Sequence, residues 1–499
     1  MSENGQHGPA ARAILRAMTL DPQTCYRALR ARDARFDGRF FVAVSSTRIY
    51  CRPVCTVKPP RRENCSFYPS AAAAESAGYR PCLRCRPELA PGNASVDATT
   101  RLAQAAASLL EDRALDEGGL EAVAARLGIT DRHLRRAFGA EFGVAPVEFA
   151  QTQRLLLAKR LLTDTALPVT EIAFASGFGS VRRFNALFRQ RYRLQPSRLR
   201  KRAAASAAPD ALVFELSFRP PYDWPALAAF LGARAIAGVE ATDARAYRRT
   251  VRIVHGGREQ RGWIEVALAP KKAALRVAVS ASLARALPPV LSRVKALMDL
   301  ACSPTEVGQA LGALARRHPG LRVPGAFDGF EVAVRAILGQ QITVAAARTL
   351  AGRFAAAFGD PLEAPFGSLT TLFPAAGRIA QLPHGRIARL GVPAARARTL
   401  VALARALAEG ALELAPNADV ESTLAKLRAI PGVGEWTAQY IAMRALAWPD
   451  AFPHTDYGVM KAMKLDDPKR VLAAAERWRP WRAYAVMHLW QSLARGGRK

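Results

Sequence analysis

The 499-residue chain has no apolar run close to the roughly 18 residues that a membrane-spanning helix requires. Its first residues, MSENGQHGPAARAILRAM, lack the order of basic, apolar and small residues that marks a secretory signal peptide. We therefore expect a cytoplasmic protein with no membrane partner, in which thiols stay reduced. Cysteine is scarce, at seven residues, so cysteines that cluster indicate metal binding or catalysis rather than disulfides.

Acidic residues are also few, because 41 Asp and Glu face 72 Lys and Arg, which gives a net charge of +31. Such an excess attracts polyphosphates, and nucleic acid is the leading candidate. The alternative is a generally basic protein without a polyanionic partner. The hydrophobic content of 50% is typical of folded proteins. The length exceeds what one hydrophobic core usually supports, so we expect several domains.

Composition and periodicity predict a multidomain α+β protein. The N-terminal segment holds six of the seven cysteines and strand-like aromatic runs, which predicts a small α/β domain. A helical segment with glycine at its turns follows, then a mixture of strand-like and helical runs, and finally a segment in which nearly everything is helical. We therefore expect four domains: a small α/β domain at 1–90, an all-α domain at 101–202, an α+β domain at 211–325 and an all-α domain at 326–499. Linkers are expected at 86–100 and 202–210.

Two pairs of cysteines are spaced so that they can share one metal ion. Cys51 and Cys55 form a C-x3-C pair, and Cys82 and Cys85 form a C-x2-C pair. Two such pairs separated by a loop can supply four thiolates to one tetrahedral Zn²⁺, so we expect one zinc ion. Most such clusters are purely structural, which is the alternative to a reactive site. We interpret the remaining cysteines, Cys25, Cys65 and Cys302, as small hydrophobic residues.

The cysteine segment resembles the N-terminal domain of the Ada methylation-response proteins. The residues that carry the resemblance are RFFVAVSSTRIYCRPVC and RRENCSFYPSAAAAESAGYRPCLRCRPE. It implies that all four cysteines bind zinc and that Cys51 also accepts a methyl group from a DNA methylphosphotriester, in a single turnover. Zinc keeps a thiol deprotonated, and the thiolate is the nucleophile. Methylation changes the formal charge of a four-thiolate zinc site from −2 to −1, so DNA affinity should rise afterwards.

The helical segment contains two units that read as helix, glycine turn, helix, at residues 120–149 and 169–200. The second helix of such a unit enters the major groove. The paired arrangement resembles the AraC-type DNA-binding domain, which implies binding to promoter DNA and makes RNA polymerase a candidate partner. A helical spacer with a solvated basic face is the alternative. The candidate DNA contacts are Arg132, His133, Arg135, Arg136, Ser180, Arg182, Arg183 and Asn185.

The stretch KLRAIPGVGEWTAQYIAMRAL, residues 426–446, places a glycine turn between two helices. Gly432 and Gly434 present backbone N–H groups without side-chain obstruction, which suits a phosphate. This helix-hairpin-helix pattern alone predicts only binding to the DNA backbone. Asp456 follows it in FPHTDYGVM, as the acid of an otherwise apolar and aromatic stretch.

A hairpin followed by such an aspartate resembles the helix-hairpin-helix–GPD glycosylases. Further matches narrow the resemblance to the AlkA-type 3-methyladenine DNA glycosylase II: FRPPYDWPALAAFLGARAIAGVE, DLACSPTEVGQALG, PGLRVPGAFDGFEVAVRAILGQQ and AERWRPWRAYAVMHLW. The resemblance implies an AlkA N-terminal domain at 211–325 and a catalytic domain at 326–499. Asp456 would stabilise the positive charge that develops on the sugar and help position or deprotonate water. A helix N-cap or a surface acid is the alternative for Asp456.

Bifunctional relatives place a lysine two residues after the second hairpin glycine, where this chain has Trp436. We therefore expect a monofunctional hydrolase that leaves an abasic site. Trp436 and Tyr440 share a helix face, and the resemblance adds Trp490. Aromatic faces attract cationic alkylpurines such as 3-methyladenine by about 0.5–2 kcal/mol each, although core packing is the alternative. The resemblance puts the wedge that fills the gap left by a flipped base at Gln341, with Ile342 next, where an apolar residue is expected.

We therefore predict a DNA alkylation repair and response protein that acts on double-stranded DNA at damaged and promoter sites. Ada proteins end in an O6-methylguanine methyltransferase with a PCHR active site, and this sequence contains no PCHR, so we expect no such activity. Two other hypotheses stay open. One is a transcription factor with a non-catalytic glycosylase-like half, and the other is a plain glycosylase whose N-terminal domains only add DNA affinity.

Overall fold

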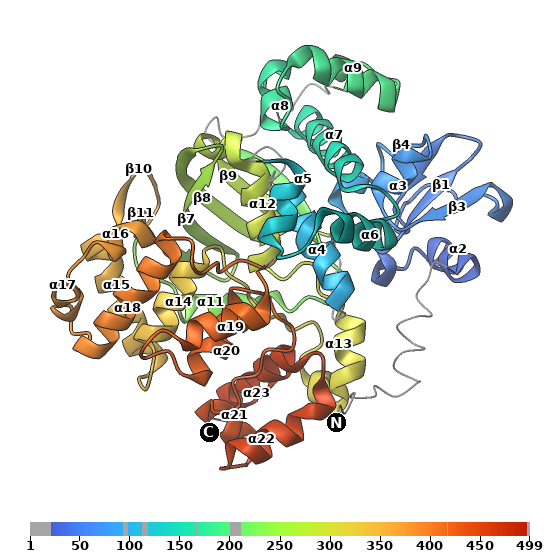
Figure 1. Ribbon diagram of the computed structural model, residues 1–499. Coiled ribbons are helices and arrows are strands. Elements are labelled where there is room, and N and C mark those ends of the chain that lie inside the picture. Colours follow the sequence, from blue (N-terminus) through green and yellow to red (C-terminus); the bar gives the residue numbers. More distant parts are fainter. Residues whose placement is uncertain are drawn as a thin grey trace.

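The computed structural model describes residues 21–92, 98–111, 118–165, 167–199, 211–416 and 418–496. It confirms a multidomain α+β protein with a small N-terminal sheet domain, a helical segment, a five-stranded sheet and a mostly helical C-terminal region (Figure 1). The linker expected at 202–210 lies outside the described residues, as do residues 93–97 of the other. Within the described ranges, we find no helix that is both long and apolar enough to span a membrane.

The N-terminal domain is built on a four-stranded sheet in the order β3-β1-β2-β4. Side chains alternate along β1, so Val42 packs with Leu29 of one helix while Ala43 packs with Ala74 of another. This explains why the run FVAV is buried throughout. The elements are α2 Pro22–Ala31, β1 Phe41–Val44, β2 Ile49–Cys51, β3 Cys65–Tyr68, α3 Ala71–Ser76 and β4 Arg80–Pro81, with short 3-10 helices at Ala34–Phe36, Arg62–Asn64 and Pro87–Leu89.

The helical segment consists of two helix-turn-helix units joined by one long helix, as the sequence predicts. Thr130 and Ser180 start the second helix of each unit, because their side-chain oxygens accept the backbone N–H of His133 and Arg183. Gly143 ends the first of these helices in the left-handed conformation. The helices are α4 Ala98–Glu111, α5 Gly119–Arg126, α6 Asp131–Phe142, α7 Pro146–Asp164, α8 Val169–Ala175, α9 Val181–Tyr192 and α10 Pro196–Leu199.

The third region is a five-stranded antiparallel sheet in the order β5-β9-β8-β7-β6. Its two longest strands are joined by Gly256 and Gly257, which both have positive φ, as a tight hairpin turn requires. The strand-like runs LVFELSF, RTVRIV, WIEVALA and ALRVAVS, which the sequence pattern indicates in this segment, all lie in or along the strands of this sheet. The elements are β5 Ala211–Ser217, α11 Trp224–Gly232, β6 Glu240–Thr242, β7 Ala246–His255, β8 Arg258–Leu268, β9 Ala274–Ser280, α12 Leu287–Leu297 and α13 Pro304–Leu311, with 3-10 helices at Ala281–Ala286 and Gly312–Arg317.

The C-terminal region is helical except for one β-hairpin that the sequence pattern did not predict. The hairpin forms because Phe366 stacks on Trp263 of β8, with ring centroids 3.7 Å apart, and because Thr250 donates to the carbonyl of Thr371. These are contacts between distant segments. The elements are α14 Gly329–Leu338, α15 Val344–Phe358, β10 Asp360–Phe366, β11 Leu369–Leu372, α16 Ala376–Ala380, α17 His384–Ala388, α18 Ala394–Ala408, α19 Val420–Arg428, α20 Glu435–Arg444, α21 Tyr457–Met463, α22 Pro468–Ala475, a 3-10 helix Glu476–Trp478 and α23 Arg482–Gly496.

The second helix-turn-helix unit and the five-stranded sheet share one hydrophobic core. Phe184 and Phe188 of α9 belong to the same buried cluster as Phe214 of β5. Arg160 of α7 reinforces this joint, because it donates to the carbonyl of Glu215 and its guanidinium lies 4.8 Å from the centre of the Phe214 ring. The DNA-binding segment and the sheet are therefore packed together rather than merely linked.

Candidate functional sites

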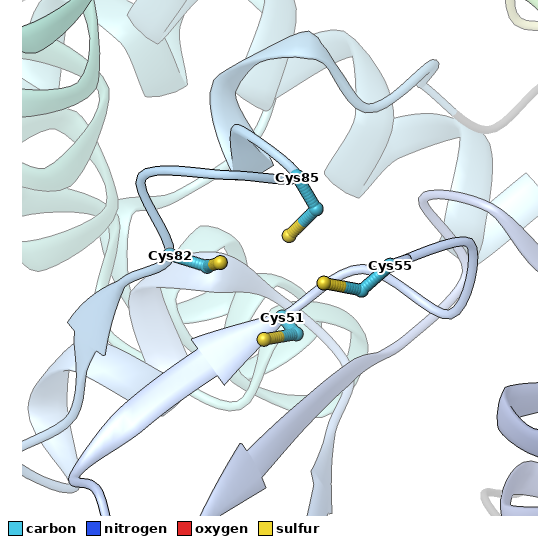
Figure 2. Close-up of side chains that lie close together, drawn as sticks. All are labelled: Cys51, Cys55, Cys82 and Cys85. Carbon is cyan, nitrogen blue, oxygen red and sulfur yellow. The ribbon is translucent and has the colours of Figure 1, made fainter. Parts of the chain in front are cut away.

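The four paired cysteines converge on one point. Figure 2 shows their sulfur atoms turned toward one another, from the end of β2, the loop after it and the turn after β4. The Sγ atoms of Cys51, Cys55, Cys82 and Cys85 all lie within 4.8 Å of one another. Tetrahedral zinc with Zn–S bonds of about 2.3 Å needs sulfurs about 3.8 Å apart. The thiol donor set and its spacing therefore fit one Zn²⁺ bound by these four cysteines, as the sequence predicts.

Backbone pairing and a buried ion pair hold this cluster together. The carbonyl of Tyr50 accepts the backbone N–H of Cys82 at 3.0 Å, which brings the two cysteine pairs side by side. Arg52 forms a buried ion pair with Asp37, and its guanidinium also donates to the carbonyl of Cys85 at 3.2 Å. The two loops that carry the cysteines are therefore fixed to each other independently of a metal ion.

Backbone N–H groups donate to the sulfurs of Cys55, Cys82 and Cys85. Arg52 N lies 3.3 Å from Cys85 Sγ, and Arg84 N lies 3.4 Å from Cys82 Sγ. A backbone hydrogen bond from Val57 also reaches Cys55.

The three cysteines outside the pairs are buried and free, in agreement with their interpretation as small hydrophobes. Cys25 and Cys65 lie in one cluster of the N-terminal domain, and Cys302 lies in the C-terminal core. Burial raises the pKa of the Cys25 and Cys302 thiols to about 11. Neither thiol is therefore prepared for nucleophilic chemistry near neutral pH.

The predicted DNA contacts lie on the outward faces of α6 and α9, because the inward faces carry Leu134, Phe138, Phe184 and Phe188. The exposed members are Arg132, Arg135, Arg136, Arg182 and Arg183, while His133 and Asn185 are half-buried. Several of the candidates have partners within the protein, and Arg136 lies 3.4 Å from Nδ1 of His133. Arg135 pairs with Asp131 at 2.9 Å, and the Ser180 hydroxyl is occupied as the cap of α9.

The helix-hairpin-helix turn lies between α19 and α20 and is fastened from two sides. Thr399 donates its hydroxyl to the carbonyl of Pro431 at 2.7 Å, and Gln340 donates its amide to the carbonyl of Gly432 at 2.9 Å. Gly432 has φ +89°, and a Cβ there would lie 2.3 Å from Thr399 Oγ1, so only glycine fits. Gly434 is the exposed N-cap of α20 and has open space around it.

Asp456 is the N-cap of α21, which was one alternative to a catalytic role in the sequence-based interpretation. Its contacts extend beyond the cap. Oδ1 accepts the backbone N–H of Val459 and the indole N–H of Trp490, each at 2.9 Å. Oδ2 accepts the indole N–H of Trp436 at 2.8 Å. The carboxylate is therefore half-buried and oriented by three donors from two helices and its own turn.

The three predicted aromatic residues lie together around this carboxylate. The rings of Trp436 and Tyr440 are stacked with centroids 5.3 Å apart, and Tyr440 lies 6.3 Å from Trp490. All three are partly buried, and Tyr440 and Trp490 also pack against the hydrophobic core of the C-terminal region. Gln341 and Ile342 lie exposed in the loop next to Gln340, and Gln341 has φ +57°.

Three further residues belong to this cluster, and no sequence pattern singled them out. Phe230 of α11 stacks on Trp490 with ring centroids 6.3 Å apart, and the Arg234 guanidinium lies 3.7 Å from the centre of the Phe230 ring. Arg444 donates to the Tyr440 hydroxyl at 2.8 Å. Burial acts to raise the pKa of Tyr440, but Arg444 and Arg234 outweigh it and leave that pKa lowered. Phe230 and Arg234 both lie in FRPPYDWPALAAFLGARAIAGVE, the stretch whose resemblance could have marked them.

Four family models match the chain in order: the metal binding domain of Ada at 24–88, a helix-turn-helix domain at 123–202, the AlkA N-terminal domain at 213–328 and the HhH-GPD superfamily base excision DNA repair protein at 334–478. These matches confirm the resemblances stated from the sequence. Together with the hairpin and Asp456, they define the class as a protein of the HhH-GPD base-excision superfamily with an Ada-type metal-binding domain and a helix-turn-helix domain.

A relative from Mycobacterium tuberculosis (strain ATCC 25618 / H37Rv), the probable bifunctional transcriptional activator/DNA repair enzyme AlkA, is 40% identical over 488 residues. The match covers 95% of this chain and 97% of the relative, so the chain belongs to that family. DNA-3-methyladenine glycosylase 2 of Escherichia coli (strain K12) is 37% identical over 278 residues, 56% of this chain and 96% of that protein. The solved 3-methyladenine DNA-glycosylase from Archaeoglobus fulgidus shares the fold over 57% of this chain and 100% of that one, with a TM-score of 0.50 and 21% identity.

Proposed function

We propose that this chain is a DNA alkylation repair and response protein whose C-terminal half hydrolyses the N-glycosidic bond of alkylated purines such as 3-methyladenine. The observation that carries the proposal is the geometry of Asp456. Three donors occupy three of its four lone-pair positions and leave one position on Oδ2 open. A carboxylate held in this way can face both a developing positive charge and one water molecule.

Asp456 would act on the sugar as the bond to the base breaks. Positive charge develops on the sugar in that step, and a fixed carboxylate stabilises it. The open position on Oδ2 would orient a water molecule and accept its proton as the water attacks the sugar. Trp436 stands where a Schiff-base lysine would be, so the reaction ends with hydrolysis and leaves an abasic site.

The partly exposed aromatic rings of Trp436, Tyr440 and Trp490 would hold the extruded base. A cationic alkylpurine is attracted by aromatic faces and is also a better leaving group than a normal purine. Gly432 and Gly434 would bind the DNA backbone through the N–H groups of the hairpin turn. The exposed loop at Gln341 and Ile342 is the candidate for the wedge that replaces the base in the stack.

We further propose that Cys51 accepts a methyl group from a DNA methylphosphotriester. The zinc site would keep the four thiols ionised, and the thiolate of Cys51 would be the nucleophile. The S–C bond forms as the methyl C–O bond breaks, and the phosphate leaves with that electron pair as a diester. The zinc-thiolate site then changes from −2 to −1, which favours DNA binding by the exposed arginines of α6 and α9, Arg132, Arg135, Arg136, Arg182 and Arg183.

The regulator half would act as an activator at promoter DNA, with RNA polymerase as its partner. We retain the domain bounds 1–90, 101–202, 211–325 and 326–499 as part of the proposal. Competing hypotheses are a transcription factor with a non-catalytic glycosylase-like half, and a glycosylase whose N-terminal domains only add DNA affinity.

Base release from alkylated duplex DNA tests the glycosylase. Asp456→Asn should lower the rate about 10²–10³-fold or more, because it removes the charge that stabilises the sugar cation. Asparagine still caps a helix, so α21 should form normally. Asp467→Asn is the matched control, because Asp467 caps the next helix, α22, and should leave the rate unchanged. An undiminished rate in Asp456→Asn would favour the non-catalytic hypothesis.

Mass spectrometry tests the methyl acceptor. After incubation of the zinc-loaded protein with duplex DNA that carries one methylphosphotriester, the peptide containing Cys51 should gain one methyl mass. Cys85 is the most exposed of the four cysteines, so its peptide is the internal comparison. A methyl mass on Cys85, or on no cysteine, would contradict the assignment of Cys51.

A further inference from the structure

Glu75 of α3 is a buried carboxylate on which three hydroxyl groups converge. Tyr50 donates to Oε1 at 3.0 Å and Tyr192 donates to the same oxygen at 3.1 Å. Thr152 donates to Oε2 at 3.2 Å. Glu75 is only 3% exposed, so these contacts lie in a low-dielectric interior where each hydrogen bond counts for more than in water.

The first donor belongs to the metal-binding domain. Tyr50 lies in β2 directly before Cys51, and its own carbonyl accepts the backbone N–H of Cys82. Tyr50 is fully buried and packs edge-to-face on Phe41, with ring centroids 5.8 Å apart. A displacement of the cysteine loops therefore moves the Tyr50 hydroxyl, because this residue is fixed to both cysteine pairs through the backbone.

The other two donors belong to the helix-turn-helix segment. Tyr192 is the last residue of α9, the helix that presents Arg182 and Arg183, and Thr152 lies on α7. The guanidinium of Arg191 adds a bond from α9 to the backbone carbonyl of Glu75 at 3.3 Å. The end of the second DNA-reading helix is thus fastened to α3 through both the side chain and the main chain of one residue.

We infer that Glu75 is a positioning residue that couples the state of the four-cysteine site to the placement of the DNA-reading helix α9. The inference rests on the proposed methyl transfer and adds a path for its effect. A methyl group on Cys51 adds volume and removes a negative charge at the end of β2. Close-packed interiors do not absorb added volume locally, so the Tyr50 side chain shifts. Because Tyr50 and Tyr192 both donate to Oε1 of Glu75, this shift alters the hydrogen bond from Tyr192 as well.

The burial of Glu75 makes this junction sensitive. Burial raises the pKa of the Glu75 carboxyl to about 7, although Tyr50, Tyr192 and Arg191 act to lower it. A carboxylate in this environment depends on all of its donors, and the loss of one changes the strength of the others. The relief of charge repulsion at the DNA surface would therefore be accompanied by a change in the position of α9.

Hydrogen exchange in the full-length zinc-loaded protein tests the inference. Cys51 is methylated in two parallel arms, with duplex DNA carrying a methylphosphotriester and with iodomethane, and methylation is verified by mass. In the wild type, exchange in residues 181–192 should change by roughly 2- to 10-fold, the range that one hydrogen bond produces. In Glu75→Gln the change should fall below about twofold. Tyr68→Phe is the control, because it removes a hydroxyl from the same domain that makes no hydrogen bond among the described residues, and it should respond like the wild type.

The two arms separate failure of the coupling from failure of methyl transfer. Methylation by iodomethane but not by DNA would refute the proposed methyl acceptor, and the coupling would be judged on the iodomethane arm. A full response of α9 in Glu75→Gln, or no response in the methylated wild type, would overturn the inference.

A double-variant cycle tests the shared carboxylate without any methylation. Tyr50→Phe and Tyr192→Phe should each speed up exchange in residues 181–192. Because both hydroxyls bond the same oxygen, the effect of the double variant should differ from the product of the single effects by about twofold or more. Effects that simply multiply would mean that the two tyrosines act independently, and the coupling through Glu75 would be wrong. Base release by Glu75→Gln should stay at the wild-type rate.

Discussion

The indole N–H of Trp436 lies 2.8 Å from Oδ2 of Asp456, across a separation of 20 residues. Trp490 contributes the equivalent bond to Oδ1 from the C-terminal helix. Both tryptophans therefore donate a hydrogen bond to the carboxylate, while their rings belong to the aromatic cluster. Substitution by phenylalanine separates the two contributions, since phenylalanine retains an aromatic face and lacks the N–H donor.

Trp436→Phe and Trp490→Phe should each lower kcat for base release by about 10-fold or more, because a hydrogen bond to a charged group contributes about 1.5–3 kcal/mol. The KM should change less, since an aromatic face remains. Steady-state kinetics on an alkylated duplex measures both parameters. Trp448→Phe is the control, because Trp448 is also half-buried and is not among the described residues that donate a hydrogen bond to Asp456. A rise in KM with unchanged kcat would assign the tryptophans to base binding alone.

Gly432→Ala and Gly434→Ala should separate the fold of the hairpin from its contact with DNA. Gly432→Ala places a methyl 2.3 Å from Thr399 Oγ1 at a positive φ, so we expect a loss of about 1–3 kcal/mol in the free energy of unfolding. Gly434→Ala meets no neighbouring atom, so stability should change by less than about 1 kcal/mol. DNA affinity should fall in both variants. Urea denaturation and titration with duplex DNA give the two readouts, and normal affinity in Gly434→Ala would contradict the backbone contact.

Glu75 should make the protein less stable as the pH rises from about 4.5 to 7. Its folded pKa of about 7 exceeds the ordinary 4.5, so the folded state binds the proton more tightly than the unfolded state does. Stability from this group is full below pH 4.5 and is lost as the pH passes 7, up to about 3 kcal/mol in total. Glu75→Gln does not titrate, so its stability relative to the wild type should rise between pH 5 and pH 8. Urea midpoints at both values measure this, and parallel pH curves would contradict it.

Arg52→Met should destabilise the metal-binding domain by about 3–5 kcal/mol, because it leaves Asp37 as an unpaired buried charge. The Arg52 and Asp37 side chains are only 8% and 5% exposed. Arg61→Met is the matched control, since Arg61 is 85% exposed and its pair with Glu63 at 3.9 Å should contribute less than about 1 kcal/mol. Thermal unfolding of the zinc-loaded protein measures both effects. Equal shifts in the two variants would mean that the buried pair has no special role.

The parts of this protein that could be predicted from sequence are those encoded within one short segment. The four cysteines, the hairpin glycines and Asp456 each belong to a local pattern whose chemistry limits its uses. Glu75 could not be found in this way, since its role depends on a contact with Tyr192 from a distant segment. The hairpin β10–β11 was not predicted for the same reason, because it depends on contacts with distant segments. Ser180, a predicted DNA contact, also has a local structural role, because its hydroxyl caps α9 by accepting the backbone N–H of Arg183.

The core shared by α9 and the five-stranded sheet has a consequence for how the two halves of the protein can be separated. Cleavage in the stretch 202–210 would free the regulator from the glycosylase in sequence only. The regulator fragment would expose the apolar side chains that now lie in the cluster with Phe214, and the sheet would lose its cover in return. We expect each fragment to aggregate or to remain bound to the other after cleavage. Separation of the regulator half from the glycosylase half therefore exposes apolar surface on both parts.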